Sequence, residues 1–145
     1  LPARLVRVVA ENGRDLGLGL TGSSKLALRM CGPWPGMDVP NREAFFKARL
    51  DAAIGARAGL LGPEHGARIV HAESDWLPGL IVDRYGDVLV MQINTAGMMA
   101  VLEAIVSSLV DVLKPSGIVL RNEKENTIEQ LSDNTRTFSK SICTR

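Results

Sequence analysis

The chain has 145 residues, of which 46% are hydrophobic and 23% are charged, and its net charge is +1. This composition fits one globular domain or two very small ones, and it excludes a chain that is disordered throughout. No apolar run approaches the roughly 18 residues of a membrane-spanning helix and the first residues form no signal peptide, so we expect a cytoplasmic protein without a membrane partner. Charge is uneven: residues 1–60 carry nine Lys/Arg and five Asp/Glu (+4), and residues 61–145 carry eight and eleven (−3).

The first thirty residues predict a small antiparallel meander. Residues 3–10 are rich in β-branched side chains, and Asn12-Gly13 is typical of a hairpin turn because both residues tolerate positive φ. Residues 15–20 alternate, with Leu16, Leu18 and Leu20 on one face, and 26–31 form the third predicted strand.

Three glycines of this region match the GxGxxG pattern of dinucleotide-binding proteins: Gly17, Gly19 and Gly22. That motif requires a helix after it, because the helix N-terminus binds the pyrophosphate. Here a strand-like segment follows, so we interpret the glycines as part of a twisted hairpin.

Prolines and glycines in residues 32–40 (GPWPGMDVP) predict a linker. Asn41 can cap a helix that runs to about Leu61. Arg49 and Arg57 of this helix lie near its apolar side. The apolar side chains are Phe46, Leu50, Ala53 and Leu60.

The second half predicts a β-β-β-α-β order, which gives a small sheet with a helix on one face. The strands are 67–72, 79–84, 87–93 and 118–121, and Tyr85-Gly86 joins two of them in a hairpin. The predicted helix spans 96–113. We therefore expect an α+β fold, divided into a meander at 1–34, a linker at 35–40, a middle α+β domain at 41–131 and a loose tail at 132–145.

Residues 73–87 (ESDWLPGLIVDRYGD) are the most distinctive part of the chain. They contain three carboxylates that Arg49 and Arg57 on the preceding helix can pair with: Glu73, Asp75 and Asp83. We interpret the five residues as structural ion pairs that join helix to sheet, because such networks are commoner than sites. A working pocket that uses these carboxylates is the alternative.

The same segment resembles the ESDGLPGLxVDRYGD signature of bacterial large-subunit ribosomal RNA cytosine-C5 methyltransferases of the RlmI type, with Trp76 in place of a glycine. Residues 45–60 are similar to the FFxxRLxxAxxxRxxL helix of that family. Residues 4–31 are similar to the second half of its N-terminal PUA domain, and 118–131 to the end of its middle domain.

The resemblance implies an enzyme of three domains: a PUA RNA-binding domain, a middle α+β domain and a Rossmann-like domain that uses S-adenosylmethionine. The meander would be part of a PUA-like barrel. The family's cofactor motif and its nucleophilic cysteine do not appear after Leu131, so we carry over no catalytic, cofactor-binding or metal residue. We expect a region that positions ribosomal RNA, is inactive alone, and acts with a C-terminal methyltransferase domain absent from this chain.

Seven basic residues are the candidates for RNA binding, through phosphates and not bases: Arg4, Arg7, Arg14, Lys25, Arg29, Arg42 and Lys47. Two alternatives stay open. One is an RNA-binding adaptor without enzymatic activity. The other is a dimerisation module, a homodimer in which the exposed side of the hairpin at 79–93 pairs with a second chain.

Overall fold

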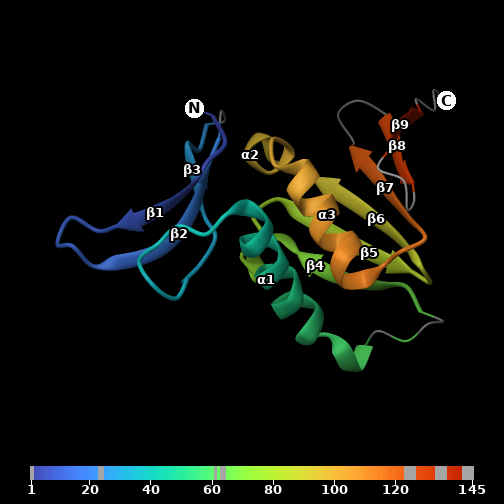
Figure 1. The fold of residues 1–145 in the computed structure, drawn as a ribbon, viewed down its shortest axis with the longest axis horizontal. Coiled ribbons are helices and arrows are strands. Elements are labelled where there is room, and N and C mark those ends of the chain that lie inside the picture. Colours follow the sequence, from blue (N-terminus) through green and yellow to red (C-terminus); the bar gives the residue numbers. More distant parts are fainter. Residues whose placement is uncertain are drawn as a thin grey trace.

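The structure of the chain is a computed structural model (Figure 1), and it describes residues 2–22, 25–60, 62, 65–122, 127–132 and 137–141. Across these residues the chain forms a three-stranded sheet and a six-stranded sheet. The mixed α+β fold and the antiparallel meander at its front are as predicted.

The three-stranded sheet is antiparallel, and its strands follow chain order: β1 (Leu5–Val9), β2 (Asp15–Thr21) and β3 (Leu28–Met30). The third strand is shorter than the predicted 26–31. Beside Gly17, which has a φ of +101°, the β1–β2 register shifts and leaves Leu16 opposite no residue of β1. Leu16 is therefore exposed in a bulge and does not join Leu18 and Leu20 on the buried face.

Helix α1 (Arg42–Gly55) begins where the sequence predicts. The side-chain oxygen of Asn41 accepts a hydrogen bond from the Ala44 N–H at 2.8 Å, which satisfies one free donor of the first turn. The buried side of the helix consists of Phe45, Phe46, Leu50 and Ala53.

The same helix ends earlier than predicted. After Gly55 the backbone tightens, with the Arg57 N–H donating to the Ile54 carbonyl at 3.0 Å, and the Arg57 guanidinium turns back to donate to the Ala53 carbonyl at 2.9 Å. A short 3₁₀ turn, η1 (Ala58–Leu60), follows. Leu60 is 72% exposed on it, so the prediction that Leu60 packs with the apolar side is wrong.

The six-stranded sheet is ordered β4-β5-β6-β7-β8-β9, and only β6 and β7 run parallel. Its strands are β4 (Ala67–His71), β5 (Leu80–Tyr85), β6 (Val88–Ile93), β7 (Gly117–Asn122), β8 (Thr127–Ser132) and β9 (Thr137–Ser141). The 3₁₀ turn η2 (Ala72–Asp75) precedes β5. The expected loose tail at 132–145 thus contains a strand, while its residues 133–136 and 142–145 lie outside the described ones.

Two of the predictions for this half are wrong in detail. The helix expected at 96–113 is broken into α2 (Ala96–Met99) and α3 (Leu102–Leu113), because Val101 leaves the helical conformation at φ −115° and ψ 19°. The hairpin at 79–93 has no free edge, since β5 pairs with β4 and β6 pairs with β7. It therefore cannot pair with a second chain as the dimerisation alternative required.

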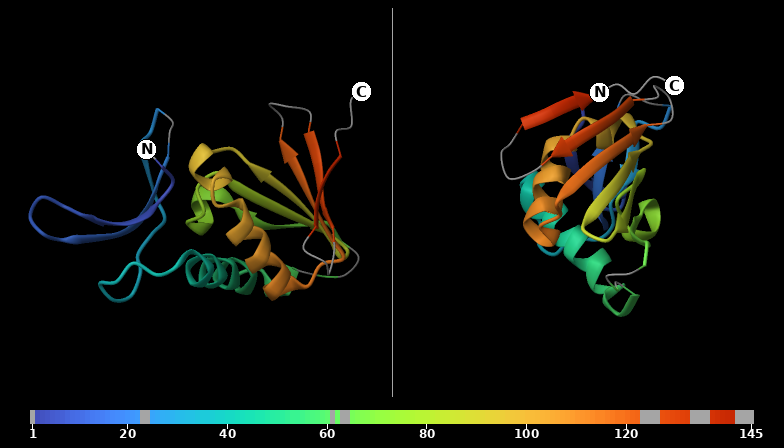
Figure 2. Two further views of the ribbon diagram at one scale, coloured as in Figure 1. Left: turned by 45° about the horizontal axis from the view of Figure 1, so that its top comes forward. Right: turned by 90° about the vertical axis from the view of Figure 1, so that its right-hand side faces the viewer.

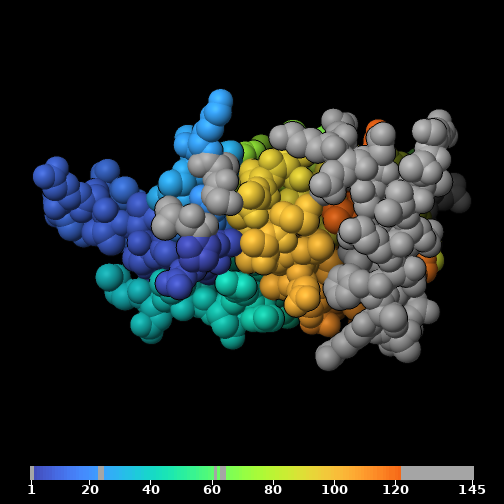
Figure 3. Space-filling view, turned by 90° about the horizontal axis from the view of Figure 1, so that it is seen from above, coloured from blue at the N-terminus to red at the C-terminus, as the bar shows by residue number. Residues whose placement is uncertain are grey.

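Helices α1 and α3 lie side by side on one face of the six-stranded sheet (Figure 2). Alternating side chains of β5 and β6 point into the core between them, including Val82 and Met91. Leu18, Leu20 and Cys31 belong to the same buried cluster, so the two sheets share one core. The β1–β2 hairpin projects from one end of the molecule (Figure 3). Within the described part of the chain, no helix has the length and apolar character needed to span a bilayer.

Candidate nucleic-acid interface

The start of β1, the end of β2 and the start of α1 meet at one place and bring two predicted RNA contacts together. The Arg42 guanidinium donates to the Ala3 carbonyl at 3.1 Å, next to Arg4 in the chain. The Arg4 backbone N–H donates to Thr21 Oγ1 at 2.9 Å. Both arginines are exposed, so their charges face solvent at neighbouring positions.

Lys25 and Arg29 flank the turn that joins β2 to β3. The turn is closed by a hydrogen bond of 3.1 Å from the Gly22 N–H to the Ala27 carbonyl. Lys25 is exposed, whereas Arg29 is half-buried and lines a small hollow with Thr95 of the loop after β6.

Two other candidates lie apart from this group. Arg14 is exposed at the tip of the projecting β1–β2 hairpin. Lys47 is exposed one turn further along α1 than Arg42, and its ammonium lies 3.7 Å from Asp51. An exposed pair of this kind adds little stability, so it leaves Lys47 available to other anions.

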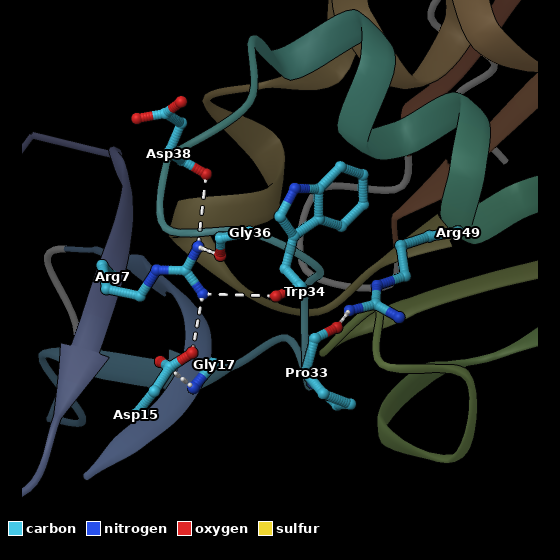
Figure 4. A network of polar contacts seen from close by, with 8 residues as sticks. All are labelled: Arg7, Asp15, Gly17, Pro33, Trp34, Gly36, Asp38 and Arg49. Carbon is cyan, nitrogen blue, oxygen red and sulfur yellow. Dashed lines mark hydrogen bonds and ion pairs between the residues drawn. The ribbon is translucent and has the colours of Figure 1, made fainter.

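Arg7 is turned inward, so its prediction as an RNA contact is wrong (Figure 4). Its side chain is only 10% exposed and pairs with Asp15 at 3.1 Å. The guanidinium also donates to carbonyls of the connecting segment: Trp34 (3.4 Å), Asp38 (3.3 Å) and Gly36. The register of the sheet explains this direction, because Arg7 lies opposite buried Leu18 and points to the same face.

Arg49 has no carboxylate partner in the part of the chain that the structure describes, so its prediction as an ion-pair residue is also wrong. It donates to the Pro33 carbonyl, as Figure 4 shows, and its guanidinium carbon lies 5.8 Å from the Trp34 ring centroid and 5.5 Å from that of Phe45. These contacts are in the range of cation–π interactions. Burial lowers the pKa of Arg49. Arg49 therefore packs against Trp34 and Pro33 of the linker and not against the acidic loop.

Arg57 and Asp75 form the predicted link between helix and acidic loop. Two hydrogen bonds of 2.9 Å join the guanidinium and the carboxylate, and Asp75 also accepts the His71 N–H at 2.6 Å. Asp83 is paired as well, but with Arg68 of the neighbouring strand at 2.7 Å and 3.0 Å. Glu73 is exposed and has no ion pair among the described residues, so its assignment to the network is wrong.

Trp76 ends η2 in the left-handed conformation, with φ 57° and ψ 28°. Glycine is the residue that this conformation favours, which gives a physical reason for the glycine in the resembling signature. The indole lies against Gly32, where an added Cβ would come within 2.5 Å of the ring. The sequence alone did not indicate this contact between the acidic loop and the linker.

Cys31 lies beneath the linker and is fully buried. Burial raises the pKa of its thiol to about 11, although nearby Arg49 opposes the shift. A thiol that stays protonated is a poor nucleophile, so Cys31 is a core residue. Cys143 lies outside the described residues.

The described residues do not fit a site for S-adenosylmethionine. Gly17, Gly19 and Gly22 lead into β3 and not into a helix. In a parallel βαβ unit, ligands bind beyond the carboxyl end of a strand, here β6. There the β2 backbone comes close, since a Cβ at Gly97 would lie 2.8 Å from the Thr21 carbonyl oxygen, and only a small hollow is left beside it. Nor do three His, Cys, Asp or Glu side chains gather as metal ligands anywhere in the described ranges.

Comparison with known proteins gives close relatives by sequence. The chain is 36% identical over 139 residues to a ribosomal RNA large subunit methyltransferase of Deinococcus radiodurans, covering 91% of this chain and 33% of the relative. It is 34% identical over 129 residues to ribosomal RNA large subunit methyltransferase I of Shewanella amazonensis, covering 87% and 32%. The chain thus spans about a third of the length of these relatives. No family model matches the chain.

Solved structures with the same fold agree with the sequence relatives. A structure described as a SAM-dependent methyltransferase from Streptococcus mutans matches 94% of this chain and 36% of its own, with a TM-score of 0.74 and 15% identity. A methyltransferase in complex with SAH matches 94% and 42%, with a TM-score of 0.69 and 14% identity. At this identity the likeness shows the fold alone. By sequence, the chain belongs to the RlmI-type family of ribosomal RNA large subunit methyltransferases, of which it represents about a third of the length.

Proposed function

We propose that this chain positions ribosomal RNA for a methyl transfer from S-adenosylmethionine whose catalytic residues lie outside it. The observation that carries the proposal is the match of nearly the whole chain to only a third of proteins named ribosomal RNA large subunit methyltransferases. Such RNA would be met in the cytoplasm. In this proposal, residues 1–34 act as a PUA-like RNA-binding part, 35–40 as a linker, and 41–131 as a middle domain.

The basic residues around the start of α1 would contact phosphates. Arg4 and Arg42 flank Ala3, and Lys25 and Arg29 flank the β2–β3 turn. Phosphate contacts fix the register of a protein on nucleic acid without reading its sequence. Arg14 and Lys47 would extend the same surface toward the hairpin tip and along α1.

The buried contacts support a division of labour between this chain and a catalytic domain. The distinctive carboxylates Asp75 and Asp83 are used in ion pairs that tie α1 and β4 to their neighbours. The buried thiol of Cys31 is protonated at neutral pH. These groups are therefore not free to act in catalysis, whereas Arg4, Lys25 and Arg42 are exposed.

The salt dependence of RNA binding tests the proposal. Fluorescence anisotropy with fragments of large-subunit ribosomal RNA, over a range of KCl concentrations, should give an affinity that falls linearly on a logarithmic scale. Arg42→Gln and Lys25→Gln should each reduce the magnitude of that slope by about 1. Arg121→Gln, which removes an exposed cation of β7, is the matched control and should leave the slope unchanged. Equal effects of all three changes would contradict the proposed surface.

A methyl-transfer assay tests the other half of the proposal. With labelled S-adenosylmethionine and ribosomal RNA, the chain alone should transfer no methyl group. Label on the RNA would show that the chain holds a donor site of its own. A non-enzymatic adaptor would also bind RNA without transferring a methyl group. The two readings are separated by adding a catalytic domain of the family: a substrate-positioning region should restore methyl transfer, and an adaptor should not.

A further inference from the structure

We infer that Arg7 and Arg49 clamp the segment between the two sheets from opposite sides, and so hold the three-stranded sheet at a fixed orientation to the six-stranded unit. Segments that connect two parts of a chain usually allow relative motion unless the interface is large and apolar. Residues 31–41 have no helix or strand of their own. The carbonyls at the two ends of this segment, of Gly32 and Asn41, accept backbone N–H groups. Between them, arginine side chains donate hydrogen bonds to the carbonyls of Pro33, Trp34, Gly36 and Asp38.

Arg7 supplies donors from the side of the three-stranded sheet. One guanidinium nitrogen binds Asp15 of its own sheet and the Trp34 carbonyl, and the other binds the Gly36 and Asp38 carbonyls (Figure 4). A single rigid group thus connects β1, β2 and three peptide units of the segment. Because the Arg7 side chain is 10% exposed and its hydrogen bond to the Trp34 carbonyl is half-buried, water competes poorly for that carbonyl.

Arg49 acts from the other side. It projects from α1, donates to the Pro33 carbonyl and lies over the Trp34 ring. The two guanidinium groups therefore bind adjacent peptide units of the same segment, one from each sheet's unit. Trp34 also contacts the Phe45 ring at 5.6 Å between centroids, which ties the segment to the buried face of α1.

Two close approaches elsewhere support a fixed orientation. Gly22 at the end of β2 and Gly97 of α2 touch by their backbones, since a Cβ on Gly22 would lie 3.1 Å from two Gly97 atoms. Trp76 of the acidic loop covers Gly32 at the start of the segment. These contacts join the three-stranded sheet to the six-stranded unit at two further points.

The consequence for RNA rests on the proposed function. Arg4 precedes β1 and Lys25 lies in the turn between β2 and β3, whereas Arg42 and Lys47 belong to α1. A fixed spacing between the two groups lets both bind one strand at once, which raises the effective concentration of the second group. Arg7 would then be a positioning residue that strengthens RNA binding without touching RNA.

Pulsed electron–electron double resonance, which measures the distance between two spin labels, tests the clamp. Labels at Glu11→Cys in the hairpin and Glu103→Cys on α3 are both at exposed positions, in a Cys143→Ser background, and Cys31 is buried. The parent should give one narrow distance distribution. Arg7→Lys keeps the charge but lacks the planar fork that reaches several carbonyls, so it should broaden the distribution. Arg49→Lys should also broaden it, and the double change should broaden it further.

Arg68→Lys, at an ion pair within the six-stranded sheet, is the matched control and should leave the distribution narrow. Circular dichroism confirms that each variant is folded, and Arg49→Lys carries the test if Arg7→Lys lowers the yield. Narrow distances in both folded clamp variants would overturn the inference. If the clamp variants give broad distance distributions but bind RNA as tightly as the parent, the two arginines fix the orientation of the sheet, and their role in RNA binding is contradicted.

Discussion

Arginine has three different roles in this chain, and its surroundings decide which. Arg57 is held by a carboxylate with which it forms two hydrogen bonds, and Arg7 and Arg49 are held by carbonyls of the connecting segment. Arg4 and Arg42 are exposed, and the Arg42 guanidinium donates one hydrogen bond to the Ala3 carbonyl. The planar fork of five donors suits all three roles, so residue type alone does not separate them.

The Arg57–Asp75 pair should matter far more for stability than the Arg68–Asp83 pair. Asp75→Asn leaves the Arg57 charge without its partner in a site that is 20% exposed on the arginine side and 10% on the aspartate side. We expect a loss of roughly 2–3 kcal/mol in the free energy of unfolding, below the usual range for a fully buried pair. Arg68→Gln should lose less than about 1 kcal/mol, because that arginine is well exposed. Urea unfolding of both variants checks the contrast.

The Trp76→Gly variant should be more stable than the Trp76→Ala variant. Both substitutions remove the indole from Gly32, but only glycine relieves the left-handed backbone at φ 57°. We expect the free energy of unfolding of the Trp76→Gly variant to be about 1 kcal/mol higher than that of the Trp76→Ala variant. Thermal unfolding of the two variants measures the difference, and equal stabilities would show that the backbone conformation carries no strain.

Cys31 should make stability depend on pH in the alkaline range. The thiol has a pKa of about 11 in the folded chain against 9.0 for an unperturbed thiol. The unfolded chain therefore loses its proton first, and the free energy of unfolding should fall by roughly 2–3 kcal/mol as the pH rises from about 9 to about 11. Below that window the contribution is complete. Cys31→Ala should flatten this part of the profile, whatever its effect on absolute stability, and an unchanged slope would be evidence against the raised pKa.

At the scale of elements, α1 shows which features the sequence could predict. Asn41, placed before an apolar run, predicted the start of the helix, and Asn12-Gly13 and Tyr85-Gly86 predicted two hairpins. These are local signals of backbone conformation. The end of α1 after Gly55 and the break at Val101 were not predicted. The Arg57–Asp75 contact that follows the helix joins residues 18 apart in sequence, which a local signal does not reveal.

The Asn41 cap should contribute about 1 kcal/mol to the free energy of unfolding. Asn41→Ala removes the acceptor for the Ala44 N–H and should lower the free energy of unfolding by roughly 0.5–2 kcal/mol. Asn41→Asp retains an acceptor and a preferred capping side chain, so it should remain close to the parent. Chemical denaturation of the three proteins tests this, and a loss in both variants would assign the effect to something other than the cap.

At the scale of the whole molecule, two sheets that hydrogen-bond separately share one core. Leu18 and Cys31 of the front pack into the same cluster as Leu50 and Met91 behind it. The resemblance of residues 73–87 to a family signature predicted the family, and the alternation of apolar residues predicted most of the second sheet. Neither could predict the direction of Arg7, since the carbonyls that bind it belong to a segment without regular structure.

Ultraviolet crosslinking of the intact chain to large-subunit ribosomal RNA, followed by identification of the crosslinked peptides, tests the proposed interface most directly. The account predicts crosslinks within residues 4–29 and 42–47, where exposed Arg4, Lys25 and Arg42 lie. Crosslinks confined to α3 and β7, or no crosslinks at protein concentrations up to high micromolar, would contradict it.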